Sequence, residues 1–356
     1  MHAYAIQHSV GMVKLDAMEN PFGLSPALQA ELGQRLGAVA INRYPGARID
    51  TLRDALKSYV DLPPGYDLML GNGSDELISL LAMACDVPGA KILAPEPGFV
   101  MYAMSARLQG LGYIGVPLTE DFELDEAAMA AAIAEHTPAL VYLAYPNNPT
   151  ANLWQPEVIR RLIAQVSAYG GLVVMDEAYQ PFSSRSWLDE IRRDPRANAQ
   201  VLLMRTLSKF GLAGIRLGYM LAPQALLAEF DKVRPPYNVS VLNAECALFA
   251  LSHAAVFAAQ AQTINQERER LMQALQAMPG ITPYHSDANM LLARLAPRAD
   301  GGDVAQQVFE GLKAHKVLVK NVSKMHPLLA RCLRLTVGTP DENTQLLAAL
   351  KELLAP

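Results

Sequence analysis

Cysteine is scarce in this chain, with three residues among 356. Cys85, Cys246 and Cys332 lie far apart and are odd in number, which argues against a disulfide framework and against the spacing of a metal site. We therefore expect reduced thiols in the core of a cytoplasmic protein and no bound metal.

An excess of positive charge is also lacking, because 30 lysines and arginines face 35 aspartates and glutamates. A net charge of −5 creates no field that attracts nucleic acid or an anionic membrane surface. No apolar run approaches the roughly 18 residues of a membrane helix, and no secretory segment is recognised at the start. We predict a protein that binds neither nucleic acid nor membrane.

The larger part of the chain has the pattern of an α/β fold. The chain is 51% hydrophobic and long enough for two domains. From about Tyr44 to Arg234, short apolar runs alternate with helical stretches. This alternation is typical of a parallel sheet with helices on both faces.

A second unit follows the run Arg234-Pro235-Pro236-Tyr237-Asn238, which breaks the alternation. We expect one long helix from Asn243 to about Gln276, strands at 290–294, 317–320 and 333–337, and a last helix from Asp341. These patterns divide the chain into an N-terminal arm (1–43), a large domain (44–240), and a linking helix with a small α/β domain (241–356).

The segment Arg205-Thr206-Leu207-Ser208-Lys209 contains the most informative side chain. Lys209 is the only lysine between Lys91 and Lys232, and it follows an apolar run, 201–204, that predicts a buried strand. Burial lowers the pKa of an amine and makes it a nucleophile toward carbonyls, as a Schiff base with pyridoxal phosphate requires. A solvated strand end is the alternative interpretation.

Asp176 ends another apolar run, 171–175, which predicts a parallel strand that carries the carboxylate to the edge of the sheet. A carboxylate there can keep a pyridinium nitrogen protonated, so that the cofactor ring withdraws electrons. Tyr179, three residues later, can donate its phenolic hydrogen to the ring oxygen of the cofactor. Alternatively, Asp176 only caps the segment that follows.

A third strand pattern, 139–144, ends in Tyr145-Pro146-Asn147-Asn148-Pro149-Thr150. Two asparagines between prolines indicate a turn in the first place. The amide of Asn148 is nevertheless well placed to bond the same ring oxygen as Tyr179. A helix-like stretch at 156–169 provides the crossover to the strand before Asp176.

Glycines at 71 and 73 precede Ser74, Asp75 and a predicted helix. Glycine lets the backbone approach an anion, and a helix N-terminus points free N–H groups at it. An ordinary Ser or Asp helix cap explains this segment equally well. Arg216 is the better phosphate ligand, because a guanidinium binds phosphate oxygens in a bidentate manner.

In this order, Asn148, Asp176-x-x-Tyr179, Ser208-Lys209 and Arg216 resemble the aspartate-aminotransferase-like enzymes, fold type I of the pyridoxal-phosphate-dependent transferases, over nearly the whole chain. The resemblance implies an α/β fold in which a mainly parallel seven-stranded sheet lies between helices. It also implies a small α/β domain that packs with the N-terminal arm, and an active site between the domains.

The same resemblance implies a role for each site residue. Lys209 would hold pyridoxal 5'-phosphate, and Asp176 would pair with its pyridine nitrogen. The other cofactor-binding residues would be Tyr179 and Asn148 at the ring hydroxyl, Phe99 stacked on the ring, Ser208 and Arg216 at the phosphate, and also Gly73, Ser74, Asp75 and Thr206. For Phe99, a place in the hydrophobic core is the competing interpretation.

More narrowly, the chain resembles the histidinol-phosphate aminotransferase family in residues 18–23, 42–46, 311–320 and 332–339. This implies a homodimer that exchanges the amino group between L-histidinol phosphate and 2-oxoglutarate in histidine biosynthesis. Lys320 and Arg334 would bind the substrate phosphate or the carboxylate of glutamate, and Asn20 would lie at the substrate mouth. Tyr44 would reach the cofactor phosphate of the neighbouring subunit. From the sequence alone, Arg334 is equally well a structural ion pair.

Three alternatives share the fold and the cofactor. An aromatic or broad-specificity aminotransferase would differ only around Asn20, Lys320 and Arg334, and a decarboxylase of a phosphorylated amino acid would use the same lysine. A regulator that binds the cofactor without catalysis would carry a DNA-binding domain, for which the short N-terminal arm leaves no room. We therefore predict an aminotransferase.

Overall fold

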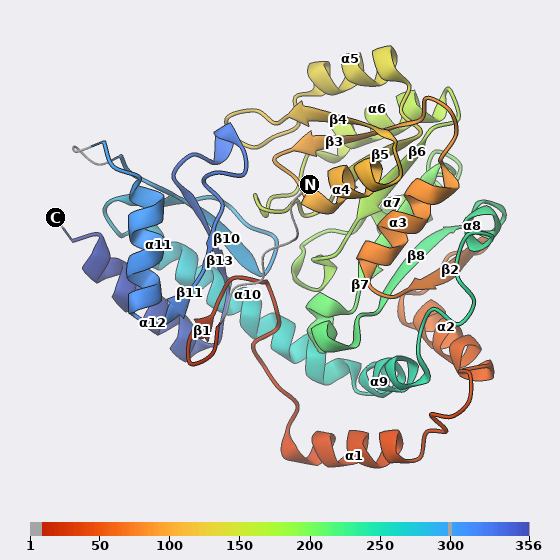
Figure 1. Cartoon of the computed structure of the whole chain (residues 1–356), viewed down its shortest axis with the longest axis horizontal. Helices are drawn as coiled ribbons and strands as arrows, with labels where there is room; N and C mark the ends of the chain where they lie inside the picture. Colours follow the sequence, from red (N-terminus) through yellow and green to blue (C-terminus); the bar gives the residue numbers. More distant parts are fainter. Residues whose placement is uncertain (1–8, 298–300, 356) are drawn as a thin grey trace.

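A seven-stranded sheet forms the centre of the molecule (Figure 1). The computed structural model describes residues 9–297 and 301–355. The strands of the sheet are β2 (Tyr66–Gly71), β3 (Lys91–Glu96), β4 (Gly112–Pro117), β5 (Leu140–Ala144), β6 (Leu172–Asp176), β7 (Val201–Thr206) and β8 (Gly218–Pro223). Their order is β2-β8-β7-β6-β5-β3-β4, and only β8 runs against its neighbours. The predicted mainly parallel seven-stranded sheet is confirmed.

Helices cover both faces of this sheet, which is why its central strands are apolar without alternation. One face packs against α3 (Ser74–Ala84), α4 (Val100–Leu108) and α8 (Gln224–Asp231). The other packs against α2 (Ala47–Tyr59), α5 (Glu126–His136), α6 (Pro156–Ser167) and α7 (Trp187–Arg193). In β5, Leu140 and Tyr142 face the helices α3, α4 and α8, whereas Val141 and Leu143 face the helices on the other side of the sheet.

Two helices, not one, connect the sheet to the rest of the chain. The single helix predicted from Asn243 to Gln276 is wrong, because α9 (Val241–Ser252) and α10 (Ala254–Gln276) meet at an angle of 76°. Alanines of α9 pack in the core of the large sheet, whereas Leu271 and Leu275 of α10 pack in the core of the small unit. The chain must therefore turn at His253, where neither glycine nor proline marks a break in the sequence.

No single helix in the described ranges is long and apolar enough to span a membrane, and only α9 and α10 taken together, across their bend, meet that test.

The small unit contains a four-stranded antiparallel sheet of order β12-β13-β10-β9. Its strands are β9 (Ile281–Pro283), β10 (Met290–Leu295), β12 (Lys320–Asn321) and β13 (Cys332–Thr336). Helices α11 (Val304–Ala314) and α12 (Pro340–Leu353) pack on it. The strand predicted at 317–320 is divided between β11 (Val317–Leu318) and β12, and β9 was not predicted.

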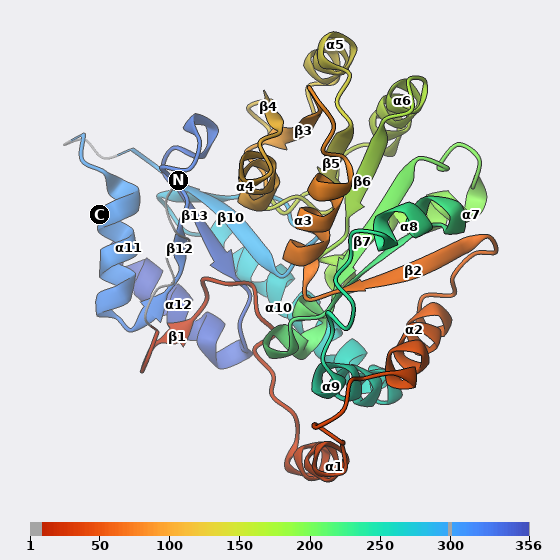
Figure 2. The same cartoon turned by 45° about the vertical axis from the view of Figure 1, so that its right-hand side comes forward.

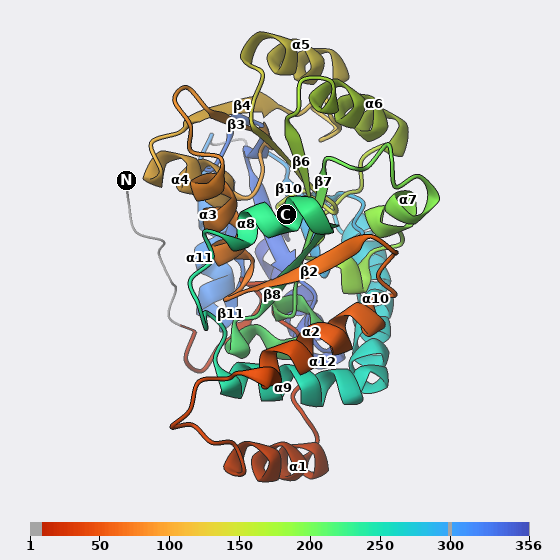
Figure 3. The same cartoon turned by 90° about the vertical axis from the view of Figure 1, so that its right-hand side faces the viewer.

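The N-terminal arm joins the small unit, as Figure 2 shows. Strand β1 (Val13–Lys14) pairs in parallel with β11, and Leu15 is buried in the same core. Helix α1 (Pro26–Gly37) then lies at the edge of the molecule beneath α9, which it contacts through Arg35 and Glu245, and has no buried residue (Figure 3). The proposed domain boundaries at residues 43 and 240 stay a prediction.

Candidate active site

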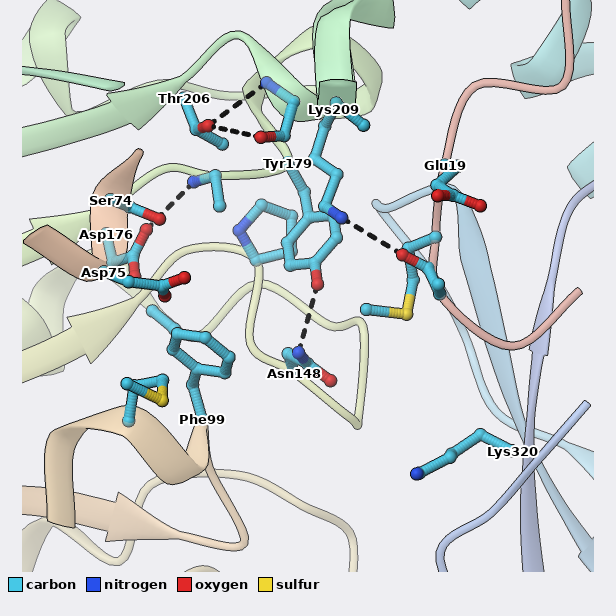
Figure 4. A pocket seen from close by; sticks show the side chains of 18 of the residues that line it. Glu19, Ser74, Asp75, Phe99, Asn148, Asp176, Tyr179, Thr206, Lys209 and Lys320 are labelled. Carbon is cyan, nitrogen blue, oxygen red and sulfur yellow. Dashed lines mark hydrogen bonds between the residues drawn. The ribbon is translucent and has the colours of Figure 1, made fainter. Parts of the chain in front are cut away.

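A pocket of about 630 Å³ opens at the carboxyl ends of the central strands, between the large sheet and the small unit (Figure 4). Neighbouring strands β3, β5, β6 and β7 deliver side chains to it, as expected at the strand ends of an open α/β sheet. Most of the predicted site residues line it: Ser74, Asp75, Phe99, Asn148, Asp176, Tyr179, Thr206, Ser208, Lys209, Arg216 and Lys320.

Lys209 lies in a short π-helical turn, η2 (Ser208–Leu212), directly after β7. Its Nζ donates to the carbonyl oxygen of Ala17 in the N-terminal arm over 3.1 Å and lies 5.9 Å from the ring centre of Tyr179. Burial, followed by the positive charge of Arg334, lowers the pKa of Lys209 to about 8. With this pKa, roughly a tenth of the amine is uncharged at pH 7, far more than for the amine of a solvated strand end.

Asp176 faces the pocket from the end of β6 and is almost completely buried. Its Oδ1 accepts from the backbone N–H of Ala178 over 3.1 Å, and its Oδ2 accepts from the hydroxyl of Tyr102 over 2.7 Å. Burial raises the pKa of Asp176 to about 6, and these two hydrogen bonds oppose that rise. One oxygen therefore caps the following turn, while the carboxylate also lines the pocket; its role toward a pyridine nitrogen stays a prediction.

Asn148 connects the centre of the pocket to the small unit. Its Nδ2 donates to the Tyr179 hydroxyl over 3.0 Å, and its Oδ1 accepts from Nη1 of Arg334 over 2.8 Å. Arg334 also donates to the carbonyl oxygen of Asp16 over 2.7 Å. Arg334 is thus buried behind Asn148, from where its charge acts on the pocket.

An anion cradle lies at the N-terminus of α3. Gly73 precedes this helix with φ of +83°, and no described side chain caps the first N–H groups, so the Ser or Asp cap considered from the sequence is wrong. A Cβ on Gly73 would lie 2.8 Å from Nη2 of Arg216, so glycine is required for this close approach. Arg216 donates to Asp75 over 2.9 Å and to the Ser208 hydroxyl over 3.3 Å.

Thr206 completes the cradle, because its hydroxyl donates to the Ser208 oxygen over 3.0 Å and accepts from the Ser208 backbone N–H over 3.1 Å. The free N–H groups of α3, the guanidinium and these two hydroxyls together favour a bound phosphate.

Four predicted residues do not line the pocket within one chain: Gly73 in the cradle, Arg334 behind Asn148, and Asn20 and Tyr44. Asn20 lies beside the pocket, where its amide donates to Gln260 over 2.9 Å and to the Phe210 carbonyl oxygen over 3.4 Å. Tyr44 is 77% exposed and stacks on Tyr237 with ring centres 4.4 Å apart. The roles assigned to Asn20 and Tyr44 stay predictions.

Several pocket residues were not predicted from the sequence: Lys14, Asp16, Glu19 and Tyr102. Lys14 forms an ion pair with Glu19, and its Nζ lies 3.4 Å from Oδ1 of Asp16. The N-terminal arm therefore contributes both positive and negative side chains to the pocket lining. Two signals could have found some of them, since Glu19 directly precedes Asn20 and Tyr102 follows Phe99 by one helical turn.

Lys320, on β12 of the small unit, lines the side of the pocket that lies opposite Asp75 and Asp176 (Figure 4). It pairs in register with Arg334 across the β12–β13 ladder. Burial and, after it, the charge of Arg334 lower the pKa of Lys320. Two cationic side chains close enough to repel each other indicate a seat for an anion.

Pocket and fold define a class of proteins: the family described as aminotransferase class I and II matches residues 10–350. A histidinol-phosphate aminotransferase of Polaromonas naphthalenivorans is 67% identical over 99% of this chain and 93% of its own length. Another, of Methylibium petroleiphilum, is 67% identical over 100% of this chain and 93% of its own length. The chain therefore belongs to the histidinol-phosphate aminotransferases within the class I and II aminotransferase family.

A solved structure agrees with this membership. The histidinol-phosphate aminotransferase of Sinorhizobium meliloti, determined in complex with pyridoxal-5'-phosphate, superimposes with a TM-score of 0.82 at 26% identity. The match covers 96% of this chain and 90% of that one. The family predicted from the order of the motifs is confirmed.

Proposed function

We propose that this chain is a pyridoxal-phosphate-dependent aminotransferase of histidine biosynthesis. It would transfer the amino group of L-histidinol phosphate to 2-oxoglutarate and so give imidazole acetol phosphate and glutamate. One observation carries the proposal: a lysine with a lowered pKa, a buried carboxylate and an anion cradle share a single pocket. The close similarity to histidinol-phosphate aminotransferases supports this substrate.

The residues present fit pyridoxal phosphate. Asp176 is a buried carboxylate without an ion-pair partner in the described part of the chain, so a protonated ring nitrogen would satisfy it. The uncapped N-terminus of α3 and Arg216 would hold the phosphate, and the Asn148 and Tyr179 pair would hold the ring hydroxyl. Phe99 flanks the pocket where it could stack on the ring.

When bound, pyridoxal phosphate supplies an aldehyde that takes up an amino group and a ring that withdraws electrons from the attached carbon. Lys209 acts as the base, because its Nζ is partly uncharged near neutral pH and would take the proton from the substrate Cα and later return it. Asp176 would keep the ring nitrogen protonated. The Asn148 amide donates to the Tyr179 hydroxyl, and this pair would hold the ring oxygen.

For the substrate, we propose that Lys320 and Arg334 provide the anion seat for the phosphate of histidinol phosphate or the distal carboxylate of glutamate. Both ligands are anions of similar reach, so one pair of cations can serve both halves of the reaction. Asn20 would lie at the mouth, because it is anchored beside the turn that carries Lys209.

The enzyme is further proposed to be a homodimer of the cytoplasm. Ile41 and Tyr44 follow α1, which has no buried residue, and Tyr237 stacks on Tyr44. All three side chains are large and exposed, and a second copy would cover them. Tyr44 would then reach the cofactor phosphate of the partner subunit. Free cysteines at 85, 246 and 332 suit a reducing compartment.

The test is steady-state formation of glutamate from L-histidinol phosphate and 2-oxoglutarate. The substitution Lys209→Ala should abolish turnover and the visible absorbance of the bound cofactor. Lys232→Ala is the matched control, because this lysine is 66% exposed and its ion pair among the described residues is with Glu229, itself exposed, so turnover should be retained. Turnover by the Lys209→Ala protein would overturn the assignment.

A further inference from the structure

We propose that Tyr102 is a positioning residue for amino transfer: its hydroxyl holds the Asp176 carboxylate in the orientation and the charged form that a protonated pyridine nitrogen requires. The inference rests on the proposed function, since it names the residue that prepares Asp176 for the cofactor.

The contact itself is short and enclosed. The Tyr102 hydroxyl donates to Oδ2 of Asp176 over 2.7 Å, and Tyr102 and Asp176 are 2% and 4% exposed. The other carboxylate oxygen accepts from the Ala178 N–H. Each oxygen therefore has one donor from the protein and a further acceptor position for a ligand in the pocket.

Two aromatic rings fix the position of this hydroxyl. Tyr102 stacks on Tyr142 of β5 with ring centres 4.3 Å apart and an interplanar angle of 13°. Phe99, at the start of α4, meets Tyr102 edge-on at 5.6 Å. Because the Tyr102 ring is held between a strand and the helix start, its hydroxyl cannot turn away from Asp176 without breaking this stack.

The hydrogen bond from Tyr102 also favours the charged form of the Asp176 carboxylate. Burial favours the neutral form of a carboxyl group, and it raises the pKa of Asp176 to about 6. The hydrogen bond from Tyr102 is the strongest influence that opposes this rise, followed by the Ala178 N–H. Charged and titratable groups around Asp176 are Asp75 of α3, Tyr102 of α4, Tyr142 of β5, and Glu177 and Tyr179 after β6, whereas the neighbouring β7 places Met204 beside it.

Asp75 and Glu177 raise the pKa of Asp176, so no other side chain among these replaces the contribution of Tyr102. Without the Tyr102 hydroxyl, the pKa of Asp176 should rise further and a larger share of the carboxyl group should be neutral near pH 7. A neutral carboxyl group cannot pair with a protonated ring nitrogen.

The experiment compares Tyr102→Phe with Tyr142→Phe in the full-length protein. Both changes remove one hydroxyl from the same ring stack. Tyr142 is the matched control, because its hydroxyl has no hydrogen-bond partner among the described residues. Each protein is titrated with pyridoxal 5'-phosphate and with its 1-deaza analogue, which keeps the aldehyde, hydroxyl and phosphate but replaces the ring nitrogen by carbon.

Tyr102→Phe should raise the Kd of pyridoxal 5'-phosphate about tenfold or more, the usual effect of losing a hydrogen bond to a charged group. It should leave the Kd of the deaza analogue unchanged, and Tyr142→Phe should change neither. A carbon-13 NMR titration of Asp176 should show a raised pKa in Tyr102→Phe only.

Equal weakening of both ligands by Tyr102→Phe would show a merely structural role and overturn the inference, as would no weakening of either. Failure of the unsubstituted protein to bind pyridoxal 5'-phosphate would instead overturn the proposed function.

Discussion

Breaking the buried ion pair between Glu177 and Arg205 should destabilise the protein more than any change to a surface ion pair. Nη2 of Arg205 lies 2.8 Å from Oε2 of Glu177, and their side chains are 8% and 0% exposed. Glu177 also accepts from the Ser186 hydroxyl and the Trp187 backbone N–H. The pair joins the ends of β6 and β7, directly beside Asp176.

The expected magnitude follows from this enclosure. Arg205→Met leaves a carboxylate uncompensated in the core, which costs about 3–5 kcal/mol of the free energy of unfolding. Replacing both partners, by Arg205→Met with Glu177→Leu, removes both buried charges, so that most of this loss should be recovered. The pair therefore provides orientation of the strand ends more than net stability.

Urea unfolding monitored by tryptophan fluorescence tests this prediction, since Trp187 contacts the pair. Arg161→Met provides the control, because Arg161 and its partner Glu126 are 59% and 40% exposed and their pair should contribute less than about 1 kcal/mol. Equal losses in Arg205→Met and Arg161→Met, or a double variant no more stable than the single variants, would refute the reasoning.

Three further predictions concern the cofactor site. Because burial lowers the pKa of Lys209 to about 8, the rate of pyridoxal phosphate capture should rise as the pH passes through about 8, and a midpoint near 10.5 would contradict this. Gly73→Ala should raise the Kd of pyridoxal phosphate about tenfold or more by displacing Arg216, whereas Gly89→Ala, at the same φ of +83° but in open space, should leave that Kd unchanged. Phe99→Leu should weaken cofactor binding measured by absorbance and Phe99→Tyr should not, because stacking requires the ring and not a hydroxyl; equal weakening by both would count against stacking.

The sequence predicted the large sheet because burial on both faces demands continuous apolar strands. The runs before Asn148, Asp176 and Lys209 each end in a polar side chain, and parallel strands bring such ends to one edge. These local signals are enough to predict the fold and the family, which the structure and the comparisons confirm. The pocket contacts themselves depend on distances between segments far apart in sequence.

The features that the sequence did not predict also depend on contacts between segments far apart in the chain. Tyr102 was overlooked because a tyrosine in an apolar helix indicates core packing, and only the fold brings its hydroxyl to Asp176. The chain bends at His253 because α9 and α10 pack in different hydrophobic cores. No residue near His253 predicts this bend from the sequence. Arg334 is not among the residues that line the pocket, since it donates to Asn148, and its proposed role as an anion ligand stays a prediction.

The most direct test of the central claim is a single-turnover experiment with the cofactor-loaded protein. L-histidinol phosphate, glutamate and phenylalanine are mixed with it separately, and the loss of the visible cofactor absorbance is followed. We predict fast conversion by histidinol phosphate and glutamate and far slower conversion by phenylalanine. Equal or faster conversion by phenylalanine would contradict the account and make this chain a broad aromatic aminotransferase, in which Lys320 and Arg334 bind carboxylates and not a phosphate.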